Sequence, residues 1–154
     1  QVRCLKLKVE IDESCSDEVI IRCSNYNDDI RLLQDVIGNV INKNAELCLS
    51  LNNTDYYINR NDILFFETTD SKTVAHTTDK MYYSNYKLYE LEQVLPPEFI
   101  RVSKSTILNC KKVSSISKNL TGASEVCFKA TPKKVYVSRM YFKVFKEKIN
   151  EVRL

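Results

Sequence analysis

The chain has 154 residues, of which 44% are hydrophobic and 28% are charged, and its formal net charge is +3. This composition indicates one folded domain, or one domain with a small addition, and it excludes an intrinsically disordered chain. With two glycines, six cysteines free of any C-x-x-C pair and one histidine, the sequence also excludes a phosphate-binding glycine loop, a dinucleotide fingerprint and zinc-ligand spacing.

The first 43 residues predict a small ββα unit. Hydrophobic and charged residues alternate strictly over residues 5–12, which is typical of a half-buried strand, and residues 19–23 suit a returning strand. Asn27 or Asp28 can then cap a helix whose apolar positions recur on one face. Such a unit is too small to stand alone. We expect its apolar face to pack within the chain, against a second subunit or against a partner.

Residues 44–154 predict a second unit that consists mostly of short strands. A helix with Leu88, Leu91 and Val94 on one face interrupts them, capped by Ser84 or Asn85 and stopped by Pro96, and a second helix covers 139–149. Short strands at this spacing favour an antiparallel sandwich or open barrel. The expected strands cover residues 46–51, 55–58, 63–68, 73–77, 81–84, 100–102, 106–109, 113–117, 126–129 and 135–137.

Charge is distributed unevenly between the two ends of the sequence. Residues 101–154 carry 13 Lys and Arg against 3 Asp and Glu, a balance of +10, whereas residues 1–100 carry 10 against 17, a balance of −7. A polarised chain of this kind is typical of a protein that docks on a polyanion.

Five sequence features in a fixed order resemble the LytTR DNA-binding domain of bacterial transcription regulators. They span residues 46–149 and are Asp62-Ile-Leu-Phe-Phe-Glu67, a Leu-x-x-Leu-Glu helix, Phe99-x-Arg-Val-x-Lys-Ser, Asn109 and Val137-Ser-Arg. The resemblance implies a mainly β, elongated antiparallel fold with short helices that reads DNA through loops. It also implies three sets of DNA-binding residues: Ser71 and Lys72, then Lys104, then Arg139 and Met140.

Two of these positions depart from the family pattern. Many members have Arg where this chain has Lys104, and a second basic residue where it has Met140. Met140 can contact a thymine methyl group or fill the core, and Arg139 with Lys143 can supply the missing charge.

Other polar residues have plainer interpretations. Arg101 lies among apolar residues and is expected to pair with Glu67 or Glu92, and His76 to lie on the wet face of a strand. The cysteines are expected to be reduced, mostly in the core. The tyrosines are expected to pack on strands and not on bases. Phosphate steering or plain solubility is expected of Lys111, Lys112, Lys133 and Lys134.

The sequence therefore predicts a cytoplasmic, sequence-specific regulator that binds double-stranded DNA and is not an enzyme. No cofactor, metal or small-molecule substrate is expected. Only 43 residues precede the LytTR-like part, too few for a receiver domain. The resemblance implies paired direct repeats, hence two copies on DNA, and a membrane-bound inhibitory partner. The alternative is a protein-interaction module whose basic face binds an acidic protein or surface.

Overall fold

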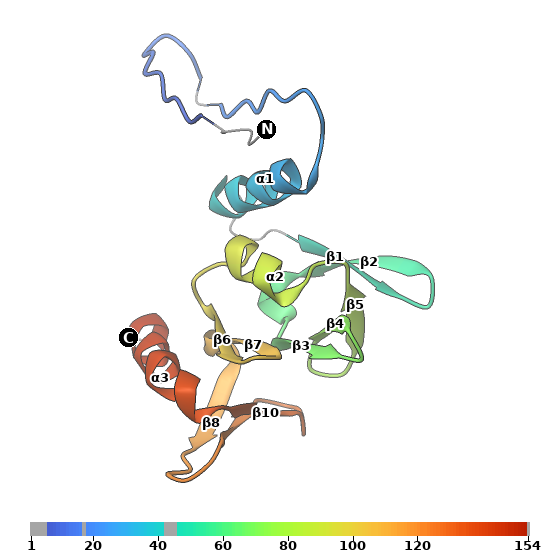
Figure 1. Ribbon diagram of the computed structural model, residues 1–154, viewed down its shortest axis with the longest axis vertical. Coiled ribbons are helices and arrows are strands. Elements are labelled where there is room, and N and C mark those ends of the chain that lie inside the picture. The colour runs from blue at the N-terminus through green and yellow to red at the C-terminus, as the bar shows by residue number, and fades with distance from the viewer. Residues whose placement is uncertain (1–5, 17, 42–45, 154) are drawn as a thin grey trace.

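The chain forms an elongated stack of layers (Figure 1). This computed structural model describes residues 6–16, 18–41 and 46–153. The N-terminal segment and α1 (Asp28–Ile41) lie at one end, and α2 (Leu88–Val94) with a large sheet lies in the middle. A small sheet and α3 (Arg139–Arg153) occupy the other end. No helix among the described residues has the length and apolar character needed to cross a membrane.

The large sheet has seven strands in the order β2-β1-β5-β4-β3-β7-β6, and each neighbouring pair is antiparallel. The small sheet has the order β10-β9-β8 and is also antiparallel. The predicted mainly β, antiparallel fold with short helices is thus confirmed. In chain order the strands are β1 (Glu46–Leu51), β2 (Thr54–Asn59), β3 (Phe65–Thr69), β4 (Lys72–His76), β5 (Met81–Ser84), β6 (Phe99–Ser103), β7 (Thr106–Asn109), β8 (Val113–Ser117), β9 (Ser124–Phe128) and β10 (Lys134–Val137). Short 3-10 helices at Arg60–Asp62 and Cys110–Lys112 follow β2 and β7.

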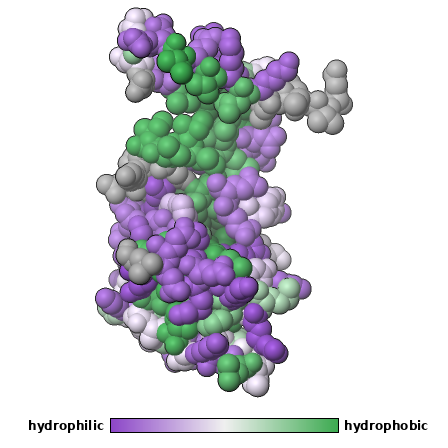
Figure 2. Space-filling view, turned by 90° about the vertical axis from the view of Figure 1, so that its left-hand side faces the viewer, coloured by the Kyte–Doolittle hydropathy of each residue, from purple (hydrophilic) through white to green (hydrophobic). Residues whose placement is uncertain are grey.

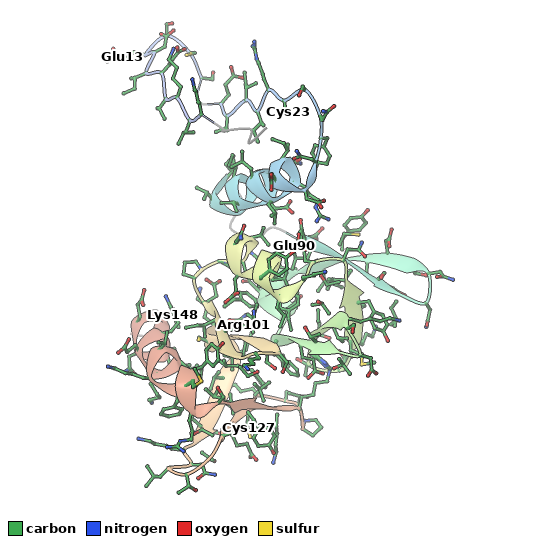
Figure 3. The ribbon with its side chains drawn as sticks, in the orientation of Figure 1. Glu13, Cys23, Glu90, Arg101, Cys127 and Lys148 are labelled. Carbon is green, nitrogen blue, oxygen red and sulfur yellow. The ribbon has the colours of Figure 1, made fainter. Side chains whose placement is uncertain are left out.

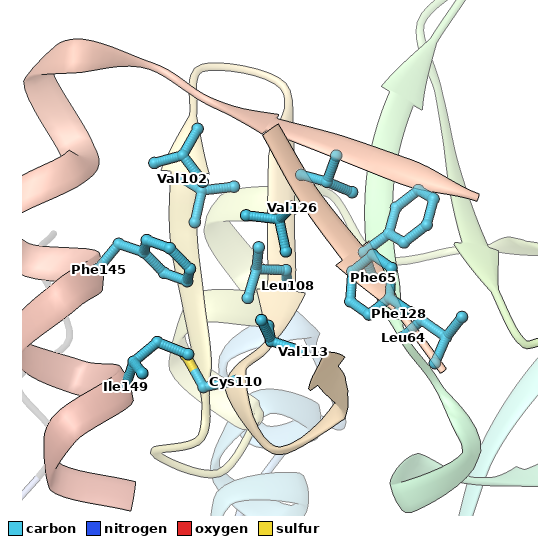
Figure 4. Close-up of a cluster of buried hydrophobic side chains, with 12 residues drawn as sticks. Leu64, Phe65, Val102, Leu108, Cys110, Val113, Val126, Phe128, Phe145 and Ile149 are labelled. Atoms are coloured by element: carbon cyan, nitrogen blue, oxygen red, sulfur yellow. The ribbon is translucent and has the colours of Figure 1, made fainter. Parts of the chain in front are cut away.

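Two hydrophobic cores lie on opposite faces of the large sheet. Neighbouring residues of a strand point to opposite faces, so Phe66 packs in the core beneath α2 while Phe65 packs in the core shared with the small sheet and α3. Phe145 and Ile149 of α3 close this second core (Figure 4). Strand β3 therefore contributes side chains to both cores.

The predicted N-terminal unit is only partly correct. Helix α1 forms as expected, and the Asn27 side chain caps it by accepting a hydrogen bond from the Ile30 amide at 3.0 Å. The two strands expected over 5–12 and 19–23 are absent from described residues 6–16 and 18–23. A turn does form, in which the Cys15 amide donates to the Asp12 carbonyl at 3.3 Å.

The register of that turn explains why the two predicted strands do not pair. A hairpin closed between Asp12 and Cys15 would set Val9 opposite Glu18 and Lys8 opposite Val19, so among its pairs only Leu7 with Ile20 would join two apolar residues. An isolated two-stranded hairpin is marginal even with a good register.

Helix α1 docks on α2. The Arg31 guanidinium lies 3.3 Å from the Glu90 carboxylate and 4.6 Å from the centre of the Tyr86 ring (Figure 3 labels Glu90). Leu32 and Val36 add apolar contacts to the core beneath α2. The expected boundary between the two units, after residue 43, lies outside the described residues.

The start of α2 also differs from the prediction. Lys87 takes the capping position, and its amide donates to the Glu90 side chain at 3.1 Å. Ser84 instead ends β5, where its hydroxyl accepts a hydrogen bond from the Tyr86 amide.

Candidate nucleic-acid interface

Two tight turns lie side by side at one end of the large sheet. Asp70 and Ser71 connect β3 to β4 with φ angles of 50° and 62°, the left-handed geometry of a two-residue hairpin turn. Lys104 and Ser105 connect β6 to β7. The Thr68 amide donates to the Ser105 carbonyl at 2.8 Å, which joins the two turns.

Arg101 holds the second turn in place. Its Nε donates to the Ser103 carbonyl at 2.8 Å, and its Nη2 donates to the Lys104 carbonyl. Its Nη1 lies 3.2 Å from the Glu92 carboxylate, so of the two expected partners Glu92 is the one found. Because the guanidinium binds two successive carbonyls, it fixes the backbone that carries the exposed Lys104 side chain (Figure 3 labels Arg101).

The beginning of α3 lies at the same end of the molecule. The Ser138 amide donates to the Val102 carbonyl at 2.9 Å, which ties the helix start to β6 just before the Lys104 turn. Arg139 is exposed, and Lys143 follows one helical turn later on the same face. Met140 is 87% exposed, which excludes the core role left open by the sequence.

We call this surface the basic end and define it as Ser71, Lys72, Lys104, Arg139, Met140 and Lys143. All six predicted residues are exposed there. Among the described residues, no carboxylate lies within ion-pair distance of its four cations. The first turn of α3 also contains no acidic residue, so the positive end of the helix dipole remains uncompensated there.

Several other lysines of residues 101–154 already have partners. Lys134 lies 3.1 Å from Glu125, and Lys111 lies 3.8 Å from Glu98. Lys133 donates to the carbonyls of Thr77 at 2.8 Å and Lys80 at 2.7 Å, and burial lowers its pKa. Phosphate steering by Lys133 is therefore wrong as a prediction, since this lysine ties the small sheet to the β4–β5 turn.

Two further lysines flank the basic end and were not singled out from the sequence. Lys118, just after β8, and Lys146 line a hollow of about 500 Å³ together with Lys143 and Phe142. The Lys118 ammonium lies 5.5 Å from the centre of the Phe142 ring. In the sequence, only the positive net charge of residues 101–154 pointed to Lys118 and Lys146.

His76 lies away from the basic end. The sequence predicted that it lies on the solvent-exposed face of a strand, and this prediction is wrong. Its side chain is 12% exposed and stacks on Phe65, with ring centres 4.3 Å apart. Nε2 lies 2.7 Å from the Glu67 carboxylate, to which it donates in the neutral ring, while Nδ1 is buried and has no hydrogen-bond partner in the described part of the chain. Burial lowers the His76 pKa despite the opposing effect of Glu67.

The cysteines are more exposed than the sequence suggested. Cys15, Cys23 and Cys48 are exposed, Cys127 is partly buried, and all of these are free thiols. Cys110 is buried, and the loss of solvation raises its pKa to about 12. The predicted core role therefore holds for Cys110 but not for the three exposed residues.

Comparisons with known proteins agree with this fold. A family model described as the LytTr DNA-binding domain matches residues 53–150. Uncharacterised HTH-type transcriptional regulators of Staphylococcus aureus strains NCTC 8325 and COL are each 27% identical over 147 residues, which cover 95% of this chain and 99% of theirs. A solved LytTr DNA-binding domain from Bacillus cereus matches with a TM-score of 0.63 at 22% identity, over 68% of this chain and 96% of that one.

The name of the relatives refers to a helix–turn–helix, but the described part of this chain has a different arrangement. Five strands separate α1 from α2, and another five separate α2 from α3. The candidate surface is made of two β-turns and the start of one helix.

Proposed function

Since the chain belongs to the LytTR DNA-binding domain family, we propose that it is a transcription regulator that reads double-stranded DNA by sequence through its basic end. A LytTR domain is a DNA-binding domain and not a class of enzyme. The observation that most favours the basic end is the convergence of two turns and a helix start, each with a cation that no carboxylate of the described residues pairs with.

The chemistry of each side chain suggests its role. Arg139 and Lys104 donate to the N7 and O6 acceptors that guanine presents in the major groove. Ser71, Lys72 and Lys143 contact phosphates, which position the protein without reading sequence. Met140, exposed and without a polar group, suits the methyl group of a thymine. In this arrangement the turns and α3 enter successive major grooves.

The proposal includes two copies bound to paired direct repeats, as the resemblance implies. It also includes regulation without a receiver domain, which is supported by the relatives, because the match accounts for 99% of their length. A membrane-bound inhibitory partner stays a prediction.

The first test is selection from a random pool of duplex DNA at physiological salt, followed by sequencing of the bound fraction. Enrichment of two similar half-sites at a fixed spacing is the expected result. Recovery of DNA with no enriched motif would refute sequence reading and favour the interaction module with an acidic partner. The ratio of affinities for different DNA sequences decides between the two functions, since any basic surface binds DNA weakly.

The second test measures affinity for the selected site. Lys104→Ala with Arg139→Ala should weaken it by roughly 30- to 20,000-fold, given about 1–3 kcal/mol for each of the two base contacts. Lys111→Ala with Lys134→Ala is the matched control, since it removes the same charge at residues that already pair with Glu98 and Glu125. Equal losses of affinity in both double variants would mean that the basic end contributes only non-specific electrostatic attraction.

A further inference from the structure

The segment Lys6–Asp12 presents an unpaired strand-like pattern to solvent. Leu7 is 94% exposed, Val9 78% and Ile11 92%, although they form one apolar stripe in the sequence. The Lys8 ammonium and the Glu10 carboxylate lie 2.5 Å apart, which places these two side chains on the same side of the segment. Exposed apolar stripes of this kind mark contact surfaces more often than single exposed residues do.

The sequence of this segment is complementary to itself when it is read antiparallel. If two copies pair about a two-fold axis through Val9, Lys6 of each lies opposite Asp12 of the other, and Lys8 lies opposite Glu10. On the other face Leu7 lies opposite Ile11. Four pairs of opposite charge and one continuous apolar face result, and directly opposed pairs of both kinds stabilise antiparallel strands. A parallel pairing in register would set like charges against each other.

The adjoining surface of α1 supplies a place for that apolar face. Leu33 is 38% exposed, Val40 77% and Ile41 70%, although α1 already packs on α2 with other residues. Figure 2 shows hydrophobic side chains gathered over this upper part of the molecule. A two-stranded ribbon alone is marginal, and this surface adds the apolar contact that it needs.

We propose that residues 6–12 pair antiparallel with residues 6–12 of a second copy of this chain, and that the paired strands and α1 form the dimer contact. The inference goes beyond the proposed function, because a two-fold contact between N-terminal segments does not follow from binding to direct repeats, whose copies are related by translation along the DNA. A symmetric contact of this kind closes on itself, so it yields dimers and not filaments.

The test is sedimentation equilibrium of the full chain without DNA, using single charge reversals. Lys8→Glu places the introduced carboxylate opposite Glu10 at both symmetric positions, and Glu10→Lys places two ammonium groups together. Each variant should weaken self-association by about tenfold. An equimolar mixture of the two should associate as well as the wild type, because each copy then meets its opposite charge.

Two controls separate pairing from other effects. Lys8→Glu with Glu10→Lys exchanges the charges within one chain, and this double variant should self-associate like the wild type. Glu18→Lys carries the same charge change as Glu10→Lys at an exposed residue outside the segment, and it should not pair preferentially with Lys8→Glu.

A monomeric wild type at about 100 μM, or a mixture that associates no better than its components, would overturn the proposal. Affinity for a single DNA half-site is measured in parallel and should not change by more than about twofold in these variants. Absence of self-association in the wild type with intact half-site binding would refute the dimer contact alone. Absence of half-site binding with intact self-association would refute the proposed DNA binding alone.

Discussion

Replacement of Arg101 by Lys tests whether the Lys104 turn must be held in place to bind DNA. Lysine keeps the charge but lacks the planar fork, so one ammonium cannot serve both the Ser103 and the Lys104 carbonyls as well as Glu92. Two hydrogen bonds at about 1 kcal/mol each give a loss of about 2 kcal/mol. We add little for Glu92, whose side chain is 44% exposed.

If these hydrogen bonds are what keeps the Lys104 turn ordered for binding, the affinity for the selected DNA site falls by up to about 30-fold, at roughly tenfold per 1.4 kcal/mol. Fluorescence anisotropy measured at several salt concentrations gives both the affinity and its dependence on salt. The slope of log affinity against log salt should stay unchanged in Arg101→Lys, whereas Lys72→Ala, which removes a proposed phosphate contact, should lower it by about one.

Arg153→Lys is the matched control, because Arg153 also donates to two carbonyls, those of Cys110 and Val113, at the far end of α3. It should lower the free energy of unfolding to a similar extent without changing DNA affinity. The reasoning is refuted if Arg101→Lys binds DNA like the wild type. A reduced salt slope in Arg101→Lys would instead mean that Arg101 contacts phosphate itself.

Three further predictions concern the fold. The free energy of unfolding should fall as pH drops from 7.5 to 5.5, because His76 takes up a proton near pH 6.5 in the unfolded chain but has a lowered pKa in the folded one. Chemical denaturation of His76→Gln should show a flatter pH dependence of this free energy. An equally steep dependence would contradict this account. Iodoacetamide should label the exposed thiols rapidly but Cys110 only on unfolding, as peptide mapping by mass spectrometry would show, since Cys110 is buried and its pKa is raised to about 12. Phe145→Ala should cost about 3–5 kcal/mol in chemical denaturation, whereas the exposed Met140→Ala should change stability by less than about 0.5 kcal/mol; a large effect of Met140→Ala would place it in the core after all.

The sequence predicted the elements of the LytTR part well, because alternation, turn residues and the proline stop are local signals. Strand Val113–Ser117 and the start of α3 at Arg139 lie where expected. The same kind of signal failed over residues 6–12, since alternation indicates a residue pattern but cannot supply the neighbouring strand.

The candidate site depended on long-range order that local patterns do not contain. Lys104 and Arg139 come together only because β6 lies at the edge of the large sheet and β10 ends beside it. The resemblance provided this arrangement in advance. It could not reveal that Lys133 binds two carbonyls, which depends on the packing of the small sheet against the large one, or that His76 is enclosed by Phe65 and Glu67, which depends on the register of β3 with β4.

The position of α3 has a consequence for how the protein is made. Leu64 and Phe65 complete their core only with Phe145 and Ile149, which a ribosome adds long after β3. The local hairpin of β3 and β4 can form early, but the last helix must leave the exit tunnel before it can dock. A nascent chain would therefore present Lys104 without Arg139, so under the proposed function DNA binding would have to wait until α3 is complete.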